Sequence, residues 1–357
     1  MAKKMNDYRA AATPRRRIEG PLAAAFGRIG FALVLLLLVS LVATPEALRG
    51  STLLSMLPFA AILAIAAIGQ TIVVQHGGLD LSVAGTVSLS AAVVTKGAHD
   101  LGGISVAIGV AIGAAVTVGL LNGLLVARLA ITPLIATLGV NALAIGVVLN
   151  VTGGVPTAAP QALTRIALER TMSVPNTAIA AFVVLMLVGV VLQRTVLGRR
   201  HVAVGVSIAA ARHAGLRVGT YRVAPYVVAA LCYAIAGMLI AGFQQSPGLS
   251  VGDPYLISTV AVVVLAGTPL AGGRASVIAT ALAALFLTQL DQLVLSVGAP
   301  TAVQYLIQAS VIAAGIASRE LTVLQRAAHR VRTRRRRELP MTSPPSFPSS
   351  SFKGGES

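Results

Sequence analysis

Residues 103–127 read GISVAIGVAIGAAVTVGLLNGLLVA, a run of 25 residues without a single charged side chain. About 20 consecutive apolar residues are enough to cross the hydrocarbon core of a bilayer as a helix. Because lipid offers no hydrogen-bond partners, the backbone of such a segment has to be helical. This stretch therefore predicts a membrane-spanning helix.

Nine further apolar stretches surround it, at residues 29–43, 53–74, 81–95, 134–150, 176–193, 223–243, 256–268, 276–296 and 303–317. The composition agrees, since 56% of the 357 residues are hydrophobic, only 11% are charged and the mean hydropathy is +0.85. A soluble domain is about one quarter charged. The sequence predicts an all-α membrane protein with about ten transmembrane helices. The stretches 81–95 and 256–268 are short and flanked by Gly, so we expect partial or broken helices there.

The net charge of +17 is unevenly distributed along this ten-span arrangement. On the side of the two termini lie 24 of the 28 Lys and Arg residues: seven in residues 1–28, six in 194–222, nine after 318, and Arg128 and Arg274. Basic residues collect in cytoplasmic loops, so both termini are predicted to be cytoplasmic. The same rule explains the charge without nucleic-acid binding.

The chain accordingly divides into three parts. Residues 1–28 form a basic cytoplasmic segment, 29–317 form the transmembrane domain, and 318–357 form a tail that is first basic and then rich in Ser and Pro. The tail is expected to be a solvated cytoplasmic segment, with binding of anionic membrane lipid as the alternative.

Motifs for enzymatic chemistry are missing. The sequence contains no GxxxxGK[ST] loop for ATP, no HExxH zinc helix and no GxSxG nucleophile elbow. The single Cys232 excludes a disulfide framework, and the five His residues lack metal-site spacing. We expect no catalytic, cofactor or metal site, and we expect His201 and His213 to be solvated.

Polar residues in or near the spans are the remaining candidates, because ionisable groups there are costly and often functional. Asp80 either lines a path or, as we favour, caps the helix that follows it at the membrane surface. Asn122 is favoured as a helix–helix hydrogen-bonding residue over a path-lining one. For Asp291 the two interpretations stay open.

Small residues four positions apart let membrane helices approach closely. Gly119 and Gly123 have this spacing, and Gly109 and Gly113 repeat it.

Three stretches, taken together, resemble the permease subunits of ribose-type ABC sugar importers over about residues 29–317. They are GGLDLSV at 77–83, LNGLLVA at 121–127 with PLIATLG at 133–139, and GTPLAGGR at 267–274, which includes Gly267, Thr268, Gly272, Gly273 and Arg274. The related branched-chain amino acid permeases share a similar plan.

The resemblance implies a type II importer architecture in a bacterial inner membrane, with two permease copies, alike or different, around one pathway. It implies ATPase subunits that bind ATP and Mg, and a periplasmic or lipid-anchored solute-binding protein that delivers a monosaccharide or similar small polar solute. The chain would be the transport subunit and no enzyme itself.

The resemblance also implies roles for individual residues. The loop 194–222 would carry a coupling helix for the ATPase, which keeps the family's Gly205, Ala210, Ala211, Arg212 and Gly215 but has Ser207 for Asn and Ala209 for Glu. Candidates for the path or for helix packing are Gly78, Asp80, Ser82, Asn122, Thr137, Asn141, Gln289 and Asp291. After Tyr255, Leu256 and Ser258 stand where acidic residues are common in the family, and Asp291 stands where amides are common. These departures imply an atypical sugar.

Three other functions are compatible with the residues. The chain would be an ABC permease for branched-chain amino acids or another solute, a proton-coupled carrier using Asp80 or Asp291, or a membrane anchor without a pathway.

Overall fold

The computed structural model describes residues 21–300, 302–310, 312–314 and 317, with side chains from Gly27 onward. Most of the predicted basic segment 1–28 and the whole tail 318–357 lie outside the described residues.

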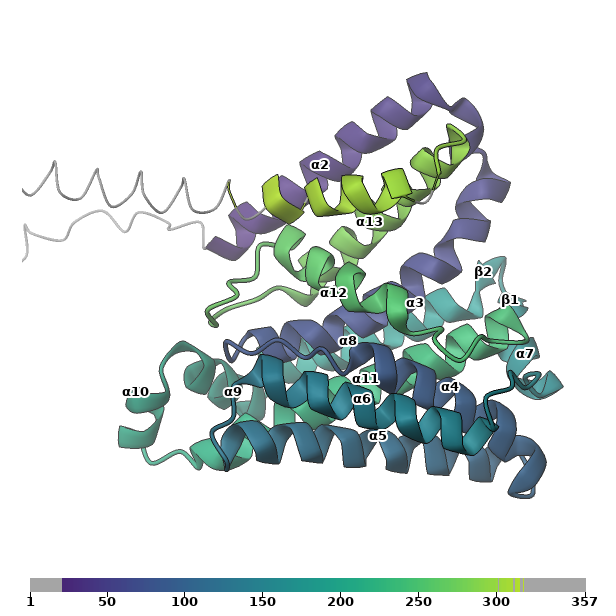
Figure 1. Cartoon of the computed structure of the whole chain (residues 1–357). Helices are drawn as coiled ribbons and strands as arrows, with labels where there is room; N and C mark the ends of the chain where they lie inside the picture. Colours follow the sequence, from purple (N-terminus) through teal and green to yellow (C-terminus); the bar gives the residue numbers. More distant parts are fainter. Residues whose placement is uncertain (1–20, 301, 311, 315–316, 318–357) are drawn as a thin grey trace, which may run out of the picture. The chain divides into compact units, whose positions relative to one another are not determined.

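Helices account for most of the described chain (Figure 1). The first half contains α2 (Pro21–Ala43), the 3-10 helix η1 (Pro45–Leu48), α3 (Gly50–Val74), α4 (Val83–Asp100), α5 (Ile104–Ala127) and α6 (Pro133–Thr152). Next come α7 (Gln161–Leu168), the antiparallel strands β1 (Arg170–Thr171) and β2 (Val174–Pro175), and α8 (Asn176–Arg194). The last part contains α9 (Val196–Val206), α10 (Ile208–His213), α11 (Val218–Gln244), α12 (Asp253–Leu265) and α13 (Val277–Ser296), and residues 302–310 are also helical.

Each predicted apolar stretch corresponds to a helix. Among the described residues, six helices are long and apolar enough to cross a membrane: α3, α5, α6, α8, α11 and α13. Shorter apolar helices occupy the stretches in α2, in α12 and at 302–310, and α4 covers the stretch 81–95. The helical membrane protein is confirmed, while the number of ten spans stays a prediction.

The core is built around α3, in which every residue from Ala60 to Val74 is buried. A helix that is apolar all round belongs inside a bundle rather than at its surface. It packs against α8, α11, α12 and α13, and α11 packs in turn against α4 and α5.

Glycines permit the closest of these approaches. A Cβ on Gly119 would lie 2.6 Å from the Cα of Val227, and one on Gly123 would lie 2.9 Å from the Cα of Val223, so α5 and α11 meet backbone to backbone. The second predicted pair behaves differently, because Gly109 and Gly113 have no atom within 4 Å of such a Cβ. Spacing alone was insufficient there, since those glycines lie on the exposed face of α5.

Apolar side chains also cover much of the surface of the described helices. Phe31 and Val42 of α2 are 71% and 86% exposed, and α5, α6 and α8 carry further exposed Leu, Val and Ile residues. Apolar surface of this extent is typical of a face that contacts lipid or another subunit.

The loops contain more structure than the sequence predicts. The stretch 151–175 includes α7 and the β1–β2 pair, and the stretch 194–222 contains two helices rather than one. Figure 1 shows α9 and α10 at one end of the helices α3, α5, α6 and α11, and α7 with the two strands at the other. We call these the α9 end and the α7 end.

Candidate functional site

The connection between α3 and α4 lies inside the bundle, and Asp80 in it is completely buried. Its Oδ1 accepts hydrogen bonds from the backbone N–H of Ser82 at 3.0 Å and from the Ser82 hydroxyl at 2.6 Å. Asn122 of α5 donates to Ser82 Oγ at 2.7 Å and to Asp80 Oδ1 at 3.4 Å.

This geometry corrects the favoured interpretation of Asp80 as a cap at the membrane surface. The N-terminus of α4 has no side-chain cap hydrogen bond. The carboxylate is instead the central acceptor of a buried cluster, in which Asn122 of α5 reaches Asp80 Oδ1. Gly77, with a φ of 73°, lies in the turn between α3 and this residue.

Other candidates hold the same connection from α6. Thr137 Oγ1 accepts from the backbone N–H of Leu81 at 3.0 Å and donates to the carbonyl of Pro133 at 2.8 Å. Asn141 Oδ1 accepts from the backbone N–H of Gly85 at 2.7 Å. A Cβ on Gly78 would lie 2.6 Å from Tyr226 Oη, so a larger residue there would require the Tyr226 ring to move.

The structure thus brings together six of the eight path or packing candidates: Gly78, Asp80, Ser82, Asn122, Thr137 and Asn141. They fasten the α3–α4 connection, and we call them, together with Gln70 and Tyr233, the Asp80 cluster.

Gln70 and Tyr233 were missed by sequence reasoning. With its amide nitrogen toward Tyr233, Gln70 donates to Tyr233 Oη at 2.7 Å and to the Asp80 carbonyl at 3.1 Å, and its oxygen accepts from the Asp80 N–H at 3.3 Å. A signal was present, because Gln70 is the only amide residue in the apolar stretch 53–74. Polar groups inside a span need such partners.

A second site lies at the α9 end, where α3 ends. The Gln75 carbonyl accepts from the backbone N–H of Gly273 at 2.8 Å. His76 Nε2 donates to the His201 carbonyl at 3.1 Å, and His201 Nε2 donates to Gln75 Oε1 at 2.9 Å. The two rings lie 4.3 Å apart, centroid to centroid. We call Gln75, His76, His201, Gly205 and Gly273 the α3–α9 junction.

His201 is therefore not solvated as expected, since it is only 8% exposed, while His213 is exposed. Burial lowers the pKa of His201 to about 3 and the pKa of His76 to about 4. Both rings are neutral near pH 7.

Glycines make this junction possible. A Cβ on Gly205 would lie 2.4 Å from the Gln75 carbonyl oxygen. Gly267, Gly272 and Gly273 have φ values of 77°, 94° and 121°, which favour glycine over any other residue. The GTPLAGGR stretch therefore owes its glycines to a loop that folds back onto the end of α3. Thr268 in this loop is buried and Arg274 is exposed.

Beyond the junction the chain continues into α10. Ser207 ends α9 and begins α10, where its Oγ accepts from the backbone N–H of Ala210 at 3.3 Å. Ser is as good an N-cap as Asn, so the departure from the family pattern keeps the cap. Ala211 packs inward, and Gly215, with a φ of 75°, follows the end of the helix. Ile208, Ala209, Ala210, Arg212 and His213 are exposed on α10. We call them the docking face, after the role that the resemblance implies for this helix.

Among the described residues, the charged side chains at the surface of the α9 end are all basic. The Arg residues at 128, 194, 199, 200, 212, 217, 222 and 274 lie there. Apart from the buried Asp80, the described residues place no carboxylate at this end. The ion pairs of Glu46 with Arg49 and of Asp100 with Lys96 belong to the α7 end.

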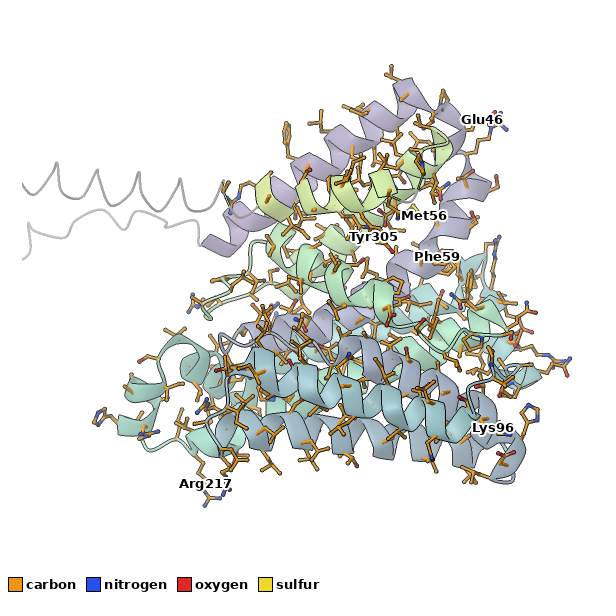
Figure 2. The ribbon with its side chains drawn as sticks, viewed as in Figure 1. Glu46, Met56, Phe59, Lys96, Arg217 and Tyr305 are labelled. Carbon is orange, nitrogen blue, oxygen red and sulfur yellow. The ribbon has the colours of Figure 1, made fainter. Side chains whose placement is uncertain are left out.

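The last two candidates lie away from both sites. Gln289 of α13 donates to Ser40 Oγ of α2 at 3.2 Å. Asp291 instead lines a pocket of about 260 Å³ between α3, α12, α13 and the helix at 302–310, which we call the α13 pocket. Figure 2 shows two of its apolar lining residues, Met56 and Phe59, beside the helix that carries Tyr305. The described residues contain no group of three His, Cys, Asp or Glu that could hold a metal ion.

Comparisons with known proteins agree on one family. Residues 52–314 match the family model described as branched-chain amino acid transport system / permease component. The chain is 32% identical to the ribose import permease protein RbsC of Bacillus subtilis (strain 168) over 263 residues, which is 72% of this chain and 81% of the relative. It is 31% identical to the galactofuranose transporter permease protein YtfT of Escherichia coli (strain K12) over 313 residues, 84% of this chain and 90% of the relative.

A third relative is the autoinducer 2 import system permease protein LsrC of Klebsiella pneumoniae, 30% identical over 73% of this chain and 76% of its own length. No solved structure matches the chain.

Proposed function

This chain belongs to the permease family of the branched-chain amino acid transport system type, and from that membership we propose that it moves a monosaccharide or similar small polar solute across the inner membrane of a bacterium. In this proposal it is the permease subunit of an ATP-driven importer. Relatives named for ribose and galactofuranose support the solute class.

ATP and Mg would be bound by separate ATPase subunits. The observation that carries this proposal is the docking face on α10, which combines exposed apolar residues with Arg212 and His213. A short exposed helix at a basic end suits a protein partner of opposite charge. The α3–α9 junction attaches this element to α3 and to the 267–274 loop, so a push on α10 would reach the core of the bundle.

The remaining partners follow from the same proposal. A solute-binding protein would deliver the solute at the α7 end, and a second permease copy, alike or different, would cover part of the exposed apolar surface. Membrane lipid would cover the rest. Both termini would be cytoplasmic, because the basic residues concentrate at the α9 end.

The first test is the recovery of partners. The tagged full chain would be purified from its native membrane in a gentle detergent, and the co-purifying proteins identified by mass. A stoichiometric ATPase with a P-loop supports the proposal. Repeated recovery of the permease alone, while a control transporter complex stays intact, contradicts it and favours a proton-coupled carrier.

The docking face provides a sharper test. Arg212→Glu reverses the charge on α10, and Gly215→Trp puts a side chain at a left-handed φ of 75°, which disturbs the end of α10. We expect both variants to insert in the membrane but to lose ATPase recovery and ATP-driven uptake. Arg165→Glu makes the same charge change on α7 and should keep the ATPase bound. Normal ATP-driven uptake in Arg212→Glu and Gly215→Trp would refute this role of α10.

A further inference from the structure

The α13 pocket contains a carboxylate that forms no ion pair with any described residue. Asp291 Oδ1 accepts from Gln308 Nε2 at 2.9 Å, and the Gln304 amide is a second hydrogen-bond partner. The described residues that line the pocket include no Lys, Arg or His. An ionised carboxylate offers about four acceptor positions, so roughly two remain open to donors from a ligand.

Further polar groups face the same space without a partner among the described residues. Tyr255 and Ser258 of α12 line the pocket, and neither hydroxyl makes a hydrogen bond within the described chain. Gln292 of α13 adds a free side-chain amide. A polar group removed from bulk water costs free energy unless it gains a partner. Hydroxyls and an amide both donate and accept, which suits a ligand that does the same.

The apolar part of the lining completes the pattern. Met56, Phe59 and Leu63 of α3 line the pocket with apolar side chains. Ligand pockets combine such apolar walls with a few placed polar groups, and most are about 300–1,000 Å³. At about 260 Å³ the α13 pocket is near the lower limit, so it suits a solute of about ten non-hydrogen atoms rather than an oligosaccharide.

We propose that the α13 pocket is a binding site for a neutral monosaccharide within the permease itself, with Asp291 as acceptor for two hydroxyls and Phe59 and Tyr255 beside the sugar ring. The inference rests on the proposed function and extends it by giving this subunit selectivity of its own. An anionic solute is disfavoured by the unpaired carboxylate. A zwitterionic amino acid would pair its ammonium with Asp291, but the described lining offers no cationic side chain for its carboxylate.

Site-directed labelling tests the proposal directly. Cys232 is the only cysteine of the sequence and is buried, so the unmodified chain reports the background. Ser258→Cys places a thiol in the pocket, and Leu295→Cys places one at its exposed rim as a second reporter. The full chain in lipid nanodiscs would be labelled with a methanethiosulfonate reagent in the presence of D-ribose or L-leucine.

We expect D-ribose to slow the labelling of both reporters by a factor of 1 + [L]/Kd, roughly threefold at twice the Kd. L-Leucine should give no protection. Asp291→Asn in the reporter background should remove the protection, whereas Asp100→Asn, which removes a carboxylate at the α7 end outside the pocket, should keep it.

Three outcomes would overturn the proposal: protection of neither reporter by D-ribose, protection by L-leucine instead, or full protection in Asp291→Asn. The proposed function would survive each of them if the assembled complex still imports its solute with ATP. If the assembled complex showed no ATP-driven import while D-ribose still protected both reporters, the proposed function would be refuted and the pocket would remain a sugar site.

Discussion

A side chain added at Gly205 should separate α9, and the α10 helix that follows it, from the end of α3. A Cβ there would lie 2.4 Å from the Gln75 carbonyl oxygen, whereas ordinary contact begins at 3.4 Å, so Gly205→Val has to displace α9 by about 1 Å. The Gln75 carbonyl cannot retreat freely, because it also accepts the hydrogen bond from Gly273. Overpacking of this kind costs about 1–3 kcal/mol.

This cost lowers the fraction of molecules in which α9 is packed against the end of α3, and ATP-driven uptake should fall with that fraction. A free-energy difference of 1–3 kcal/mol corresponds to roughly a 5- to 150-fold shift in equilibrium. We therefore expect Gly205→Val to reduce ATP-driven uptake by at least about fivefold while the membrane content of the protein stays close to that of the unmodified chain.

The matched control is Gly219→Val in the first turn of α11. No atom lies within 4 Å of a Cβ at Gly219, and the change in helix propensity is similar at both positions. The assay is ATP-driven uptake by the reconstituted importer, with ATPase activity measured in parallel. Equal uptake by Gly205→Val and Gly219→Val would show that the contact with Gln75 does not transmit motion.

Three further predictions concern the α3–α9 junction, the Asp80 cluster and the packing of α5 against α11. Burial lowers the pKa of His76 to about 4 and that of His201 to about 3, against 6.5 in water, so the α3–α9 junction is most stable above pH 6.5 and weakens as the pH falls toward 4. When the pH is lowered from 7.5 to 5.5, hydrogen exchange of the α9 amides, corrected for its intrinsic rate, should accelerate by up to about tenfold per histidine. His201→Gln should halve this acceleration on a logarithmic scale. Asn122→Ala removes the amide that donates hydrogen bonds to Asp80 Oδ1 and Ser82 Oγ, and it should lower the unfolding free energy in detergent by about 1–2 kcal/mol. Thr117→Ala on the exposed face of α5 should change this free energy little. Equal losses in the two variants would contradict the importance of the Asp80 cluster. Gly119→Leu should reduce the folded yield sharply because it collides with the α11 backbone, whereas Gly113→Leu should be tolerated by the isolated chain, and thermal unfolding of both variants would decide.

The helices were predictable because the membrane constrains them strongly. A span needs about 20 apolar residues and a fully bonded backbone, so residues 103–127 and 53–74 could be assigned from composition alone. The family was identified from three motifs, and the comparisons confirm it. The end of α10 was also predictable, since Gly after an Ala-rich run is a common helix stop.

The Asp80 cluster and the α3–α9 junction were harder to predict, because they join residues far apart in the chain. Nothing in the sequence pairs Gln70 with Tyr233 or Gln75 with His201, and these contacts depend on the rotation of α3 against its neighbours. His201 was misjudged for this reason, since its basic sequence surroundings suggest solvent while its ring lies against His76. Asp80 was misjudged because an Asp-x-Ser sequence before a helix has the same appearance whether the turn is exposed or buried.

The Gln75 carbonyl has a consequence for recombination between related permeases. Gly205 lies against this oxygen, and the backbone N–H of Gly273 donates a hydrogen bond to it. Three segments that are far apart in the sequence therefore meet at one atom. A chimera that takes residues 194–222 from one parent and 267–274 from the other would combine surfaces that had never fitted each other. Breakpoints that keep the end of α3 and both segments with one parent should give active hybrids, and for this architecture they define the smallest exchangeable module.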